Sequence, residues 1–597
     1  MTEKWNLTDI YTGFDSPEFI ADYQSLAPLV EKMDKQSSQL NSFEDAVTLV
    51  RLFEDYSITM DRLASYANYV FTTDTDSEDA TKYMYLLETV DAETSRATVR
   101  GAAFLARQKD LPGLAKAHGI SEYVYYLTRQ AESYSHMMSE DEETLTALLT
   151  TTGSSAWEML QDKLISGLTC QYKDPKQNGE ERTININECR NLAYDPCPDV
   201  RKAAYEAELA AYPKIEESSA AALNSIKGEV NLLCRLRKYE SPLAETLVAS
   251  AMSQKTLDAM FAAIDANVGS FRDYMKAKAR YLAKTQGKEY TKGLPFYEMF
   301  APVGASADKA YTYSQAKALV SETFAAFSPG MAAVAKEAFD RSWIDVYPRE
   351  GKVSGAFCGD IYAIKQFRIL LNFGGSLSDA ITLAHELGHG YHSTLIMQEG
   401  IFNTDYPMPL AETGSTFCEF ILTNAALASM PDEEKLQLLE NSLQDATQVI
   451  LDIYSRYLFE QAVFKTREDH PISVDEFKGF MLDAQKKAYG DGLDPDYLHP
   501  YMWVIKPHYY SGGRSFYNFP YAFGHLLASG LYKIFERNPD TFGEMYDNFL
   551  RATGKMSIKD SCALLGVDVE DTAFWNDAID VIKENIKEFK RLTQGSV

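Results

Sequence analysis

The run HELGH at residues 385–389 constrains this chain most, because it fits an α-helix that carries a metal site. Residues four apart share one face of a helix, so His385 and His389 can direct two imidazole nitrogens at a single metal ion. Glu386 lies roughly 100° around the same helix from His385, so it stands beside the metal without having to ligate it. A carboxylate in that place can take a proton from a water on the metal.

The residues around the motif favour a metal site over a chance match, which occurs in long chains. Ser378 and Asp379 are expected to cap a helix that runs into the motif. Gly388 costs helix stability and indicates that another part of the chain comes close there. With His392, the motif region holds three of only nine histidines in 597 residues, a clustering that a shared role would explain.

The third ligand is not expected to be a cysteine or a histidine. The seven cysteines form no C-x-x-C pair and none falls in the motif helix, so the metal should keep an open position for water. A histidine six residues after His389, as in metzincins, is excluded because Leu395 occupies that position and His392 occupies the position of the required glycine.

Downstream glutamates are the remaining candidates. Glu399 falls where the motif helix is expected to end. Glu412 and Glu419 lie in the apolar segment 410–422, which is expected to be helical with both carboxylates on one face, about 10 Å apart along the axis. One can ligate the ion while the other supports a ligand from behind, and the spacing leaves open which does which.

Several stretches together resemble one family. HELGHGYH at 385–392, followed by AETGSTFCEF at 411–420, resembles the oligoendopeptidase F group of the thimet-oligopeptidase family of zinc metallopeptidases. Further matches occur in the family's order: WNLTDIY at 5–11, SGAFCG at 354–359, ILLNFGG at 369–375, PHYY at 507–510 and SFYNFPYAFG at 515–524. The resemblance thus spans nearly the whole chain.

The resemblance implies a mainly α, multi-helical zinc peptidase with a small β-sheet next to the H-E-x-x-H helix and a deep substrate channel. It implies one Zn²⁺ per chain, held by His385, His389 and Glu412. Glu419 would support the ligands from outside, and Glu386 would be the catalytic base.

The resemblance also implies that a C-terminal loop stabilises the tetrahedral intermediate, a task for hydrogen-bond donors aimed at the developing oxyanion. His508 fits the family position, and Tyr517 and Tyr521 are the candidate phenol donors. Pro520 separates the two tyrosines, so their spacing does not place them on one helix face and leaves open which one serves.

Hydrophobic periodicity predicts helices over about 16–165 and again from about 198 to the end. Between them, 169–186 is expected to be a β-hairpin that turns at Asn178-Gly179. A strand-like pattern over 343–375 predicts a short sheet directly before the motif helix.

Length suggests two regions, because one core rarely spans 597 residues. We expect an N-terminal helical domain at 1–195 that ends in the hairpin, and a catalytic domain at 196–597. A net charge of −28 argues against nucleic acid as a partner. The sequence shows no secretory signal and no apolar run that could span a membrane, and its sparse cysteines favour a reducing compartment, so we expect the cytoplasm.

The sequence therefore predicts a zinc-dependent endopeptidase that cleaves short unfolded peptides, with 354–359 as a candidate edge strand for the substrate backbone. One alternative is a zinc aminopeptidase, although the short ligand spacing and the acidic motif that captures a free N-terminus are not found. Another is a catalytically inactive peptide-binding scaffold, although Glu386 and the ligand set are intact. The sequence indicates no oligomeric state.

Overall fold

The computed structural model describes residues 3–304 and 310–595, and these form a mainly helical protein, as expected. The chain divides into two compact units, each built from three segments. The first unit comprises Met1–Met137, Asp308–Ala425 and Ile534–Val567, and the second comprises Met138–Ala307, Ala426–Lys533 and Asp568–Val597. The division at residue 195 that the sequence suggested stays a prediction about domains.

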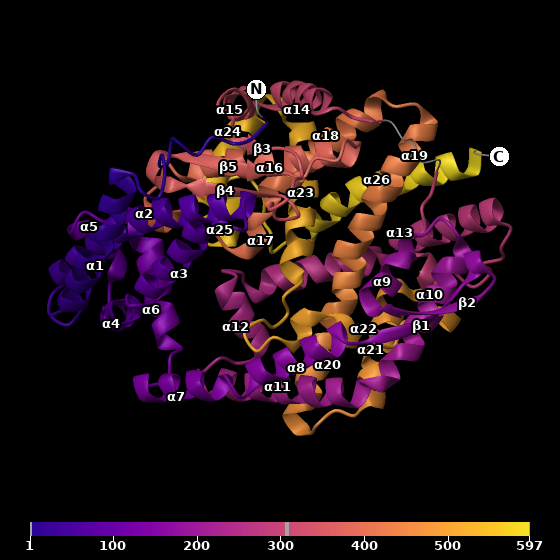
Figure 1. Cartoon of the computed structure of the whole chain (residues 1–597), viewed down its shortest axis with the longest axis horizontal. Helices are drawn as coiled ribbons and strands as arrows, with labels where there is room; N and C mark the ends of the chain where they lie inside the picture. Colours follow the sequence, from indigo (N-terminus) through magenta and orange to yellow (C-terminus); the bar gives the residue numbers. More distant parts are fainter. Residues whose placement is uncertain (1–2, 305–309, 596–597) are drawn as a thin grey trace. The chain divides into compact units, whose positions relative to one another are not determined.

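Helices make up most of the first unit (Figure 1). They are α1 (Pro17–Ser37), α2 (Phe43–Thr73), α3 (Glu78–Ala92), α4 (Ser95–Ala106), α5 (Leu111–Ala117), α6 (Val124–Ser135), α14 (Tyr313–Phe327), α15 (Pro329–Asp340), α16 (Leu377–Ile396), α17 (Met408–Ala411), α24 (Pro539–Ala552) and α25 (Ile558–Ala563). Two further helices, α18 (Thr413–Ser429) and α23 (Phe519–Arg537), have residues in both units.

A three-stranded sheet lies next to α16 in the first unit (Figure 1). Its strands are β3 (Ile344–Asp345), β4 (Phe357–Ile361) and β5 (Gln366–Leu370), in the order β3-β5-β4. Strand β5 pairs in parallel with β3 and antiparallel with β4. The sheet predicted before the motif helix is thus confirmed, and β4 forms one of its edges.

The other edge of this sheet is covered by the N-terminal segment. The Asn6 amide donates to the Ser342 carbonyl at 2.7 Å, and the Val346 amide donates to the Glu3 carbonyl at 3.0 Å. Trp5 packs edge-on against Tyr69 of α2, with ring centroids 5.2 Å apart. The sequence signature at 5–11 therefore closes the β3 side of the sheet.

The N-cap of the motif helix α16 lies two residues before Ser378, the residue expected to cap it. Ser376 is the N-cap: its hydroxyl accepts from the Asp379 amide at 3.1 Å, and the Asp379 carboxylate accepts from the Ser376 amide at 2.8 Å. The expected cap at Ser378 was wrong, because this reciprocal capping box needs the two residues three apart. Farther along α16, Gly390 lets the ring of Phe367 on β5 come so close that a Cβ would lie 2.5 Å from it.

The second unit is also mainly helical. Its helices are α7 (Glu140–Thr150), α8 (Ser154–Ser166), α9 (Ile186–Asn191), α10 (Pro198–Ala211), α11 (Glu216–Leu236), α12 (Pro242–Ala249), α13 (Gln254–Gln286), α19 (Asp432–Thr447), α20 (Ile453–Asp469), α21 (Val474–Tyr489), α22 (Met502–Ile505) and α26 (Thr572–Gly595).

The predicted hairpin in the second unit is confirmed. Strands β1 (Thr169–Asp174) and β2 (Glu180–Asn185) pair antiparallel. Asn178 and Gly179 between them have φ of 54° and 79°, the left-handed conformation that asparagine and glycine tolerate best.

Candidate metal centre

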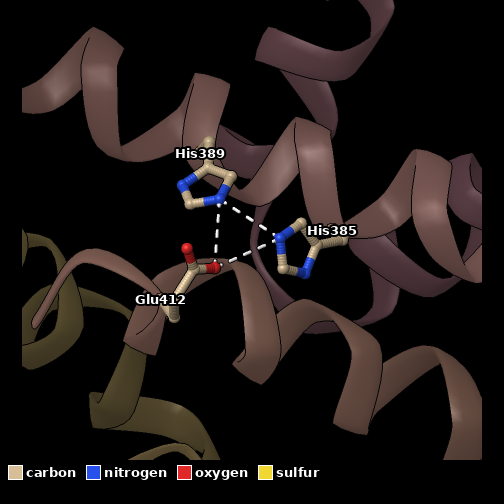
Figure 2. Close-up of side chains that lie close together, drawn as sticks. All are labelled: His385, His389 and Glu412. Carbon is tan, nitrogen blue, oxygen red and sulfur yellow. Dashed lines mark hydrogen bonds and ion pairs between the residues drawn. The ribbon is translucent and has the colours of Figure 1, made fainter. Parts of the chain in front are cut away.

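Two histidines of α16 and one glutamate converge at a single point in the first unit (Figure 2). Nε2 of His385 lies 3.2 Å from Nε2 of His389. Oε2 of Glu412 lies 3.3 Å from the first nitrogen and 3.4 Å from the second. These are the two histidines of the motif and the glutamate that the family resemblance selected.

The spacing of these three atoms fits zinc. Nitrogen and oxygen ligands about 2.0–2.1 Å from a tetrahedral zinc lie roughly 3.3–3.4 Å from one another. The three observed separations fall at or near that range. Among the described residues three protein atoms form the cluster, so a fourth position would stay open for water or substrate, as in catalytic zinc sites.

A close approach between α16 and the start of α18 brings Glu412 to the histidines. A Cβ at Gly388 would lie 2.8 Å from both Sγ of Cys418 and Cα of Ser415, so any larger residue would push α18 away. The close neighbour that Gly388 indicated in the sequence is therefore the beginning of α18.

Glu412 and Glu419 do not lie within one uninterrupted helix. Glu412 stands at the junction of α17 and α18, and its carbonyl accepts from the Thr416 amide at 2.9 Å, in the first turn of α18. Glu419 lies two turns farther along α18. The two carboxylates nevertheless reach the same imidazole, because Glu412 contacts Nε2 of His385 and Glu419 accepts a hydrogen bond from Nδ1.

The carboxylates make the cluster favourable for positive charge. Burial alone would lower the pKa of His385, but its hydrogen bonds to Glu412 and Glu419 raise it to about 10. Burial opposes the charge on Glu412, yet the two histidines hold the pKa of its carboxyl well below the usual range. A raised pKa means that the imidazole of His385 readily holds a second proton, and a metal cation at the convergence point would replace that proton.

Glu386 lies beside the cluster and is not one of its converging groups. Its side chain is buried, and that burial raises the pKa of its carboxyl, although His385 and His389 oppose the shift. A raised pKa brings a carboxylate closer to the range in which it can both take and return a proton near neutral pH.

The third histidine of the motif region is structural. His392 is fully buried, stacks on Tyr406 with ring centroids 4.3 Å apart, and its Nε2 lies 2.8 Å from Oγ1 of Thr553 on the loop after α24. Burial lowers its pKa to about 3, so it stays neutral. The clustering of three histidines in the sequence thus reflects two different roles.

The predicted oxyanion donors lie in the second unit and are grouped with one another there. The hydroxyls of Tyr517 and Tyr521 are 2.8 Å apart, and the rings of His508 and Tyr517 are 6.0 Å apart. Burial, aided by the nearby cation of Arg456, lowers the pKa of His508 to about 3. Its Nε2 is buried without a hydrogen-bond partner among the described residues. Their role toward the metal site stays a prediction.

Sequence reasoning missed one polar link beside the site. Ser393, one turn after His389 on α16, donates a hydrogen bond to the carboxylate of Asp360 on β4. Burial raises the pKa of that carboxyl. The contact ties the motif helix to the edge strand, and no local signal reveals it because the partners are 33 residues apart.

Comparison with known families agrees with the geometry. A model described as Peptidase family M3 matches residues 191–581, and one described as Oligopeptidase F matches residues 108–169. A relative named oligoendopeptidase F, chromosomal, from Lactococcus lactis subsp. cremoris is 28% identical over 422 residues, which cover 70% of this chain and 68% of the relative. An oligoendopeptidase F homolog from Lactococcus lactis subsp. lactis is 25% identical and aligns over 100% of this chain and 98% of its own length.

Solved structures share the fold. One from Chlamydophila abortus superposes with a TM-score of 0.85 at 20% identity, covering 99% of this chain and 98% of the other. An oligoendopeptidase-F from Enterococcus faecium gives a TM-score of 0.68 at 18% identity, covering 97% of this chain and 99% of the other.

Proposed function

Because this chain belongs to peptidase family M3, we propose that it is a zinc-dependent endopeptidase that hydrolyses internal bonds of short, unfolded peptides. The observation that carries the proposal is the convergence of His385, His389 and Glu412 at zinc-ligand separations, with the buried Glu386 beside them. The similarity to proteins named oligoendopeptidase F supports the same activity.

The ligand set and its neighbours divide the chemistry between them. Zinc held by His385, His389 and Glu412 would polarise the scissile carbonyl and make a water acidic enough to react near neutral pH. Glu386 accepts the proton of the attacking water and returns it to the leaving nitrogen. Glu419 holds the Nδ1 proton of His385, which leaves Nε2 unprotonated and free to act as a ligand.

The outer edge of β4 is the part of the first unit suited to a peptide backbone. The carbonyl of Asp360 accepts from Tyr69 and Ser65 of α2, at 3.1 and 3.2 Å, so it points away from β5. Alternate residues of a strand point the same way, so the backbone of Cys358 also faces outward. A peptide that pairs with this edge would bind chiefly through its main chain. The pairing would stop at Asp360, whose carbonyl is already occupied by Ser65 and Tyr69.

Peptide digestion tests the activity. The purified protein is incubated with a peptide mixture, with and without a chelator, and the cut sites are mapped by mass spectrometry. We expect internal cuts that stop on chelation and resume when zinc is restored. Peptides acetylated at the N-terminus and amidated at the C-terminus should still be cut, whereas an aminopeptidase would leave them intact. No cleavage of any peptide by the zinc-loaded protein would favour the inactive scaffold.

Substrate size gives a second arm of the test, since only unfolded peptides can pair with a strand edge. A native globular protein should remain intact under conditions in which its denatured fragments are cut. Efficient digestion of the native protein would contradict the proposed substrate class.

A cytoplasmic location belongs to the same proposal. All seven cysteines are free thiols, as a reducing compartment favours. Within residues 3–304 and 310–595, every helix is either too short or too polar to span a lipid bilayer.

A further inference from the structure

A cavity of about 380 Å³ lies beside the first two turns of α16 in the first unit. The end of the sheet contributes its apolar wall, with Ala356, Leu371 and Phe373. Asp379 and Thr382 of α16 line the other side. The volume is within the range of small-ligand pockets, typically about 300–1,000 Å³, so it can take a large amino-acid side chain.

The carboxylate of Asp379 brings negative charge to this cavity. Its Oδ2 accepts from the amide and hydroxyl of Ser376, at 2.8 and 2.6 Å. Its Oδ1 accepts no hydrogen bond, and the carboxylate forms no ion pair, within the part of the chain that the structure describes. One half of the carboxylate therefore holds the helix cap, and the other half is available to a ligand.

A second acceptor lines the same cavity. The side-chain amide nitrogen of Asn372 donates to the carbonyls of Val353 and Gly355, at 2.9 and 2.8 Å. These two bonds fix the side chain and leave its oxygen as an acceptor. The cavity thus combines an apolar wall with two oxygen acceptors, which suits a side chain with an aliphatic stem and a cationic end.

The cavity lies close to the metal ligands along α16. Thr382 and Asp379 precede His385 by three and six residues, or about 4.5 and 9 Å along the helix axis. An extended peptide advances about 3.4 Å per residue. A substrate whose scissile bond lies at the metal would therefore present a side chain to the cavity within about three residues of that bond.

We propose that this cavity is a substrate subsite in which Asp379 selects a lysine or arginine side chain of the peptide. The inference rests on the proposed endopeptidase function. The aliphatic stem packs against Leu371 and Phe373, and the cation meets the free oxygen of Asp379 and the amide oxygen of Asn372. A neutral side chain loses the charge-assisted bond, and an acidic one is repelled.

A peptide series tests the subsite on the wild-type enzyme. The peptides are N-acetylated and C-amidated, and a single Lys, Arg, Gln or Glu is moved through each position around a common cleavage site. At one position within three residues of the cut, Lys and Arg should raise kcat/KM about tenfold over Gln. That ratio should shrink as salt is added, because screening weakens exposed charge pairs.

Three results on the wild-type enzyme would overturn the proposal. One is cleavage of all peptides without a preference for Lys or Arg at any position. Another is a preference that appears only when the same series is repeated with free N-termini, because the recognised cation would then be the terminal ammonium. No cleavage of any peptide would remove the proposed function and this subsite together, and is thus distinct from cleavage without selectivity.

A matched pair of variants separates selection from helix capping. Asp379→Asn should bring the Lys-to-Gln ratio of kcat/KM near one, because the charge-assisted bond is lost only for the Lys peptide, whereas any effect of the weakened helix cap falls on both peptides alike. Asp45→Asn removes the carboxylate of the equivalent capping box at the start of α2, which does not line the cavity, and should leave the ratio unchanged. Zinc content and thermal unfolding are measured for both variants.

An equal loss for Lys and Gln peptides in Asp379→Asn would show that Asp379 only caps α16, and would refute the proposal. A change of the ratio in Asp45→Asn would refute it as well. If Asp379→Asn does not fold, the peptide series on the wild-type enzyme and its salt dependence still decide whether the cavity selects Lys or Arg.

Discussion

The buried ion pairs of the second unit and the carboxylates around the histidines of α16 in the first unit are balanced in opposite ways. The second unit pairs its buried charges internally: Lys227 lies 3.2 Å from Glu460, Arg201 lies 2.5 Å from Glu298, and all four side chains are almost fully buried. In the first unit, the carboxylates around the histidines of α16 form no ion pair with a lysine or arginine in the described part of the chain.

The difference separates structural charge from functional charge. A buried ion pair that contains its own cation is complete once the chain has folded. Among the described residues, the carboxylates of Glu412 and Glu419 form ion pairs with histidines alone, so protons on those histidines or a cation from solution must balance them and the neighbouring Glu386. The comparison therefore predicts that variants of the first cluster change zinc binding or catalysis, whereas variants of the buried pairs change stability.

The largest effect is expected from Glu386→Gln. Removal of the base should lower kcat by roughly 10²–10⁴-fold. Zinc content, measured by elemental analysis, should stay at the wild-type level because Glu386 is not one of the converging groups. If zinc is lost together with activity, Glu386 is a ligand and its assigned role is wrong.

Lys227→Met tests whether a buried ion pair of the second unit contributes to stability and not to zinc binding. It leaves the buried carboxylate of Glu460 without its cation and should destabilise the fold by about 3–5 kcal/mol, measured by chemical denaturation. Zinc content per folded molecule should not change. The double variant Lys227→Met/Glu460→Met should recover much of the loss, since an apolar pair of similar size needs no partner. A double variant as unstable as the single one would contradict this account of the pair.

Variants of Tyr517 and Tyr521 test the part of the second unit in which a buried polar group, His508, is not fully paired. Next to these self-contained ion pairs, Nε2 of His508 lacks a hydrogen-bond partner among the described residues, as expected of a group reserved for substrate. Tyr517→Phe and Tyr521→Phe are compared in kcat, with zinc content as the control. Loss of a true oxyanion donor should cost roughly 10²–10³-fold in kcat. A variant within a few-fold of wild type identifies the tyrosine that does not serve the transition state.

The smallest effect is expected when Glu419 is removed. Glu419→Ala should weaken zinc binding or activity by roughly 10–100-fold, as is typical for groups that support a metal ligand from outside. Glu412→Ala, the matched variant at the residue just before α18, should lower zinc occupancy much further. Equal metal loss in the two variants, or the reverse order, would show that the ligand and supporting roles were assigned wrongly.

Local patterns predicted the elements that carry the site. The alternating pattern before the motif became β3–β5, and the Asn-Gly pair became the turn of the β1–β2 hairpin. The cap of α16 was misplaced by two residues, from Ser376 to Ser378, because Ser, Asp and Asn near a helix start are all plausible caps. Only the reciprocal bond between Ser376 and Asp379 distinguishes them.

By itself, the sequence determined the helix of HELGH, the shared face of His385 and His389, and the place of Glu386 beside them. These features follow from helical periodicity, which acts over a few residues. Only the tertiary structure decided that Glu412 and Glu419 reach opposite nitrogens of His385, since that depends on how closely α18 approaches Gly388. The pocket at Asp379 was likewise decided by packing, because its walls come from segments that no local pattern connects.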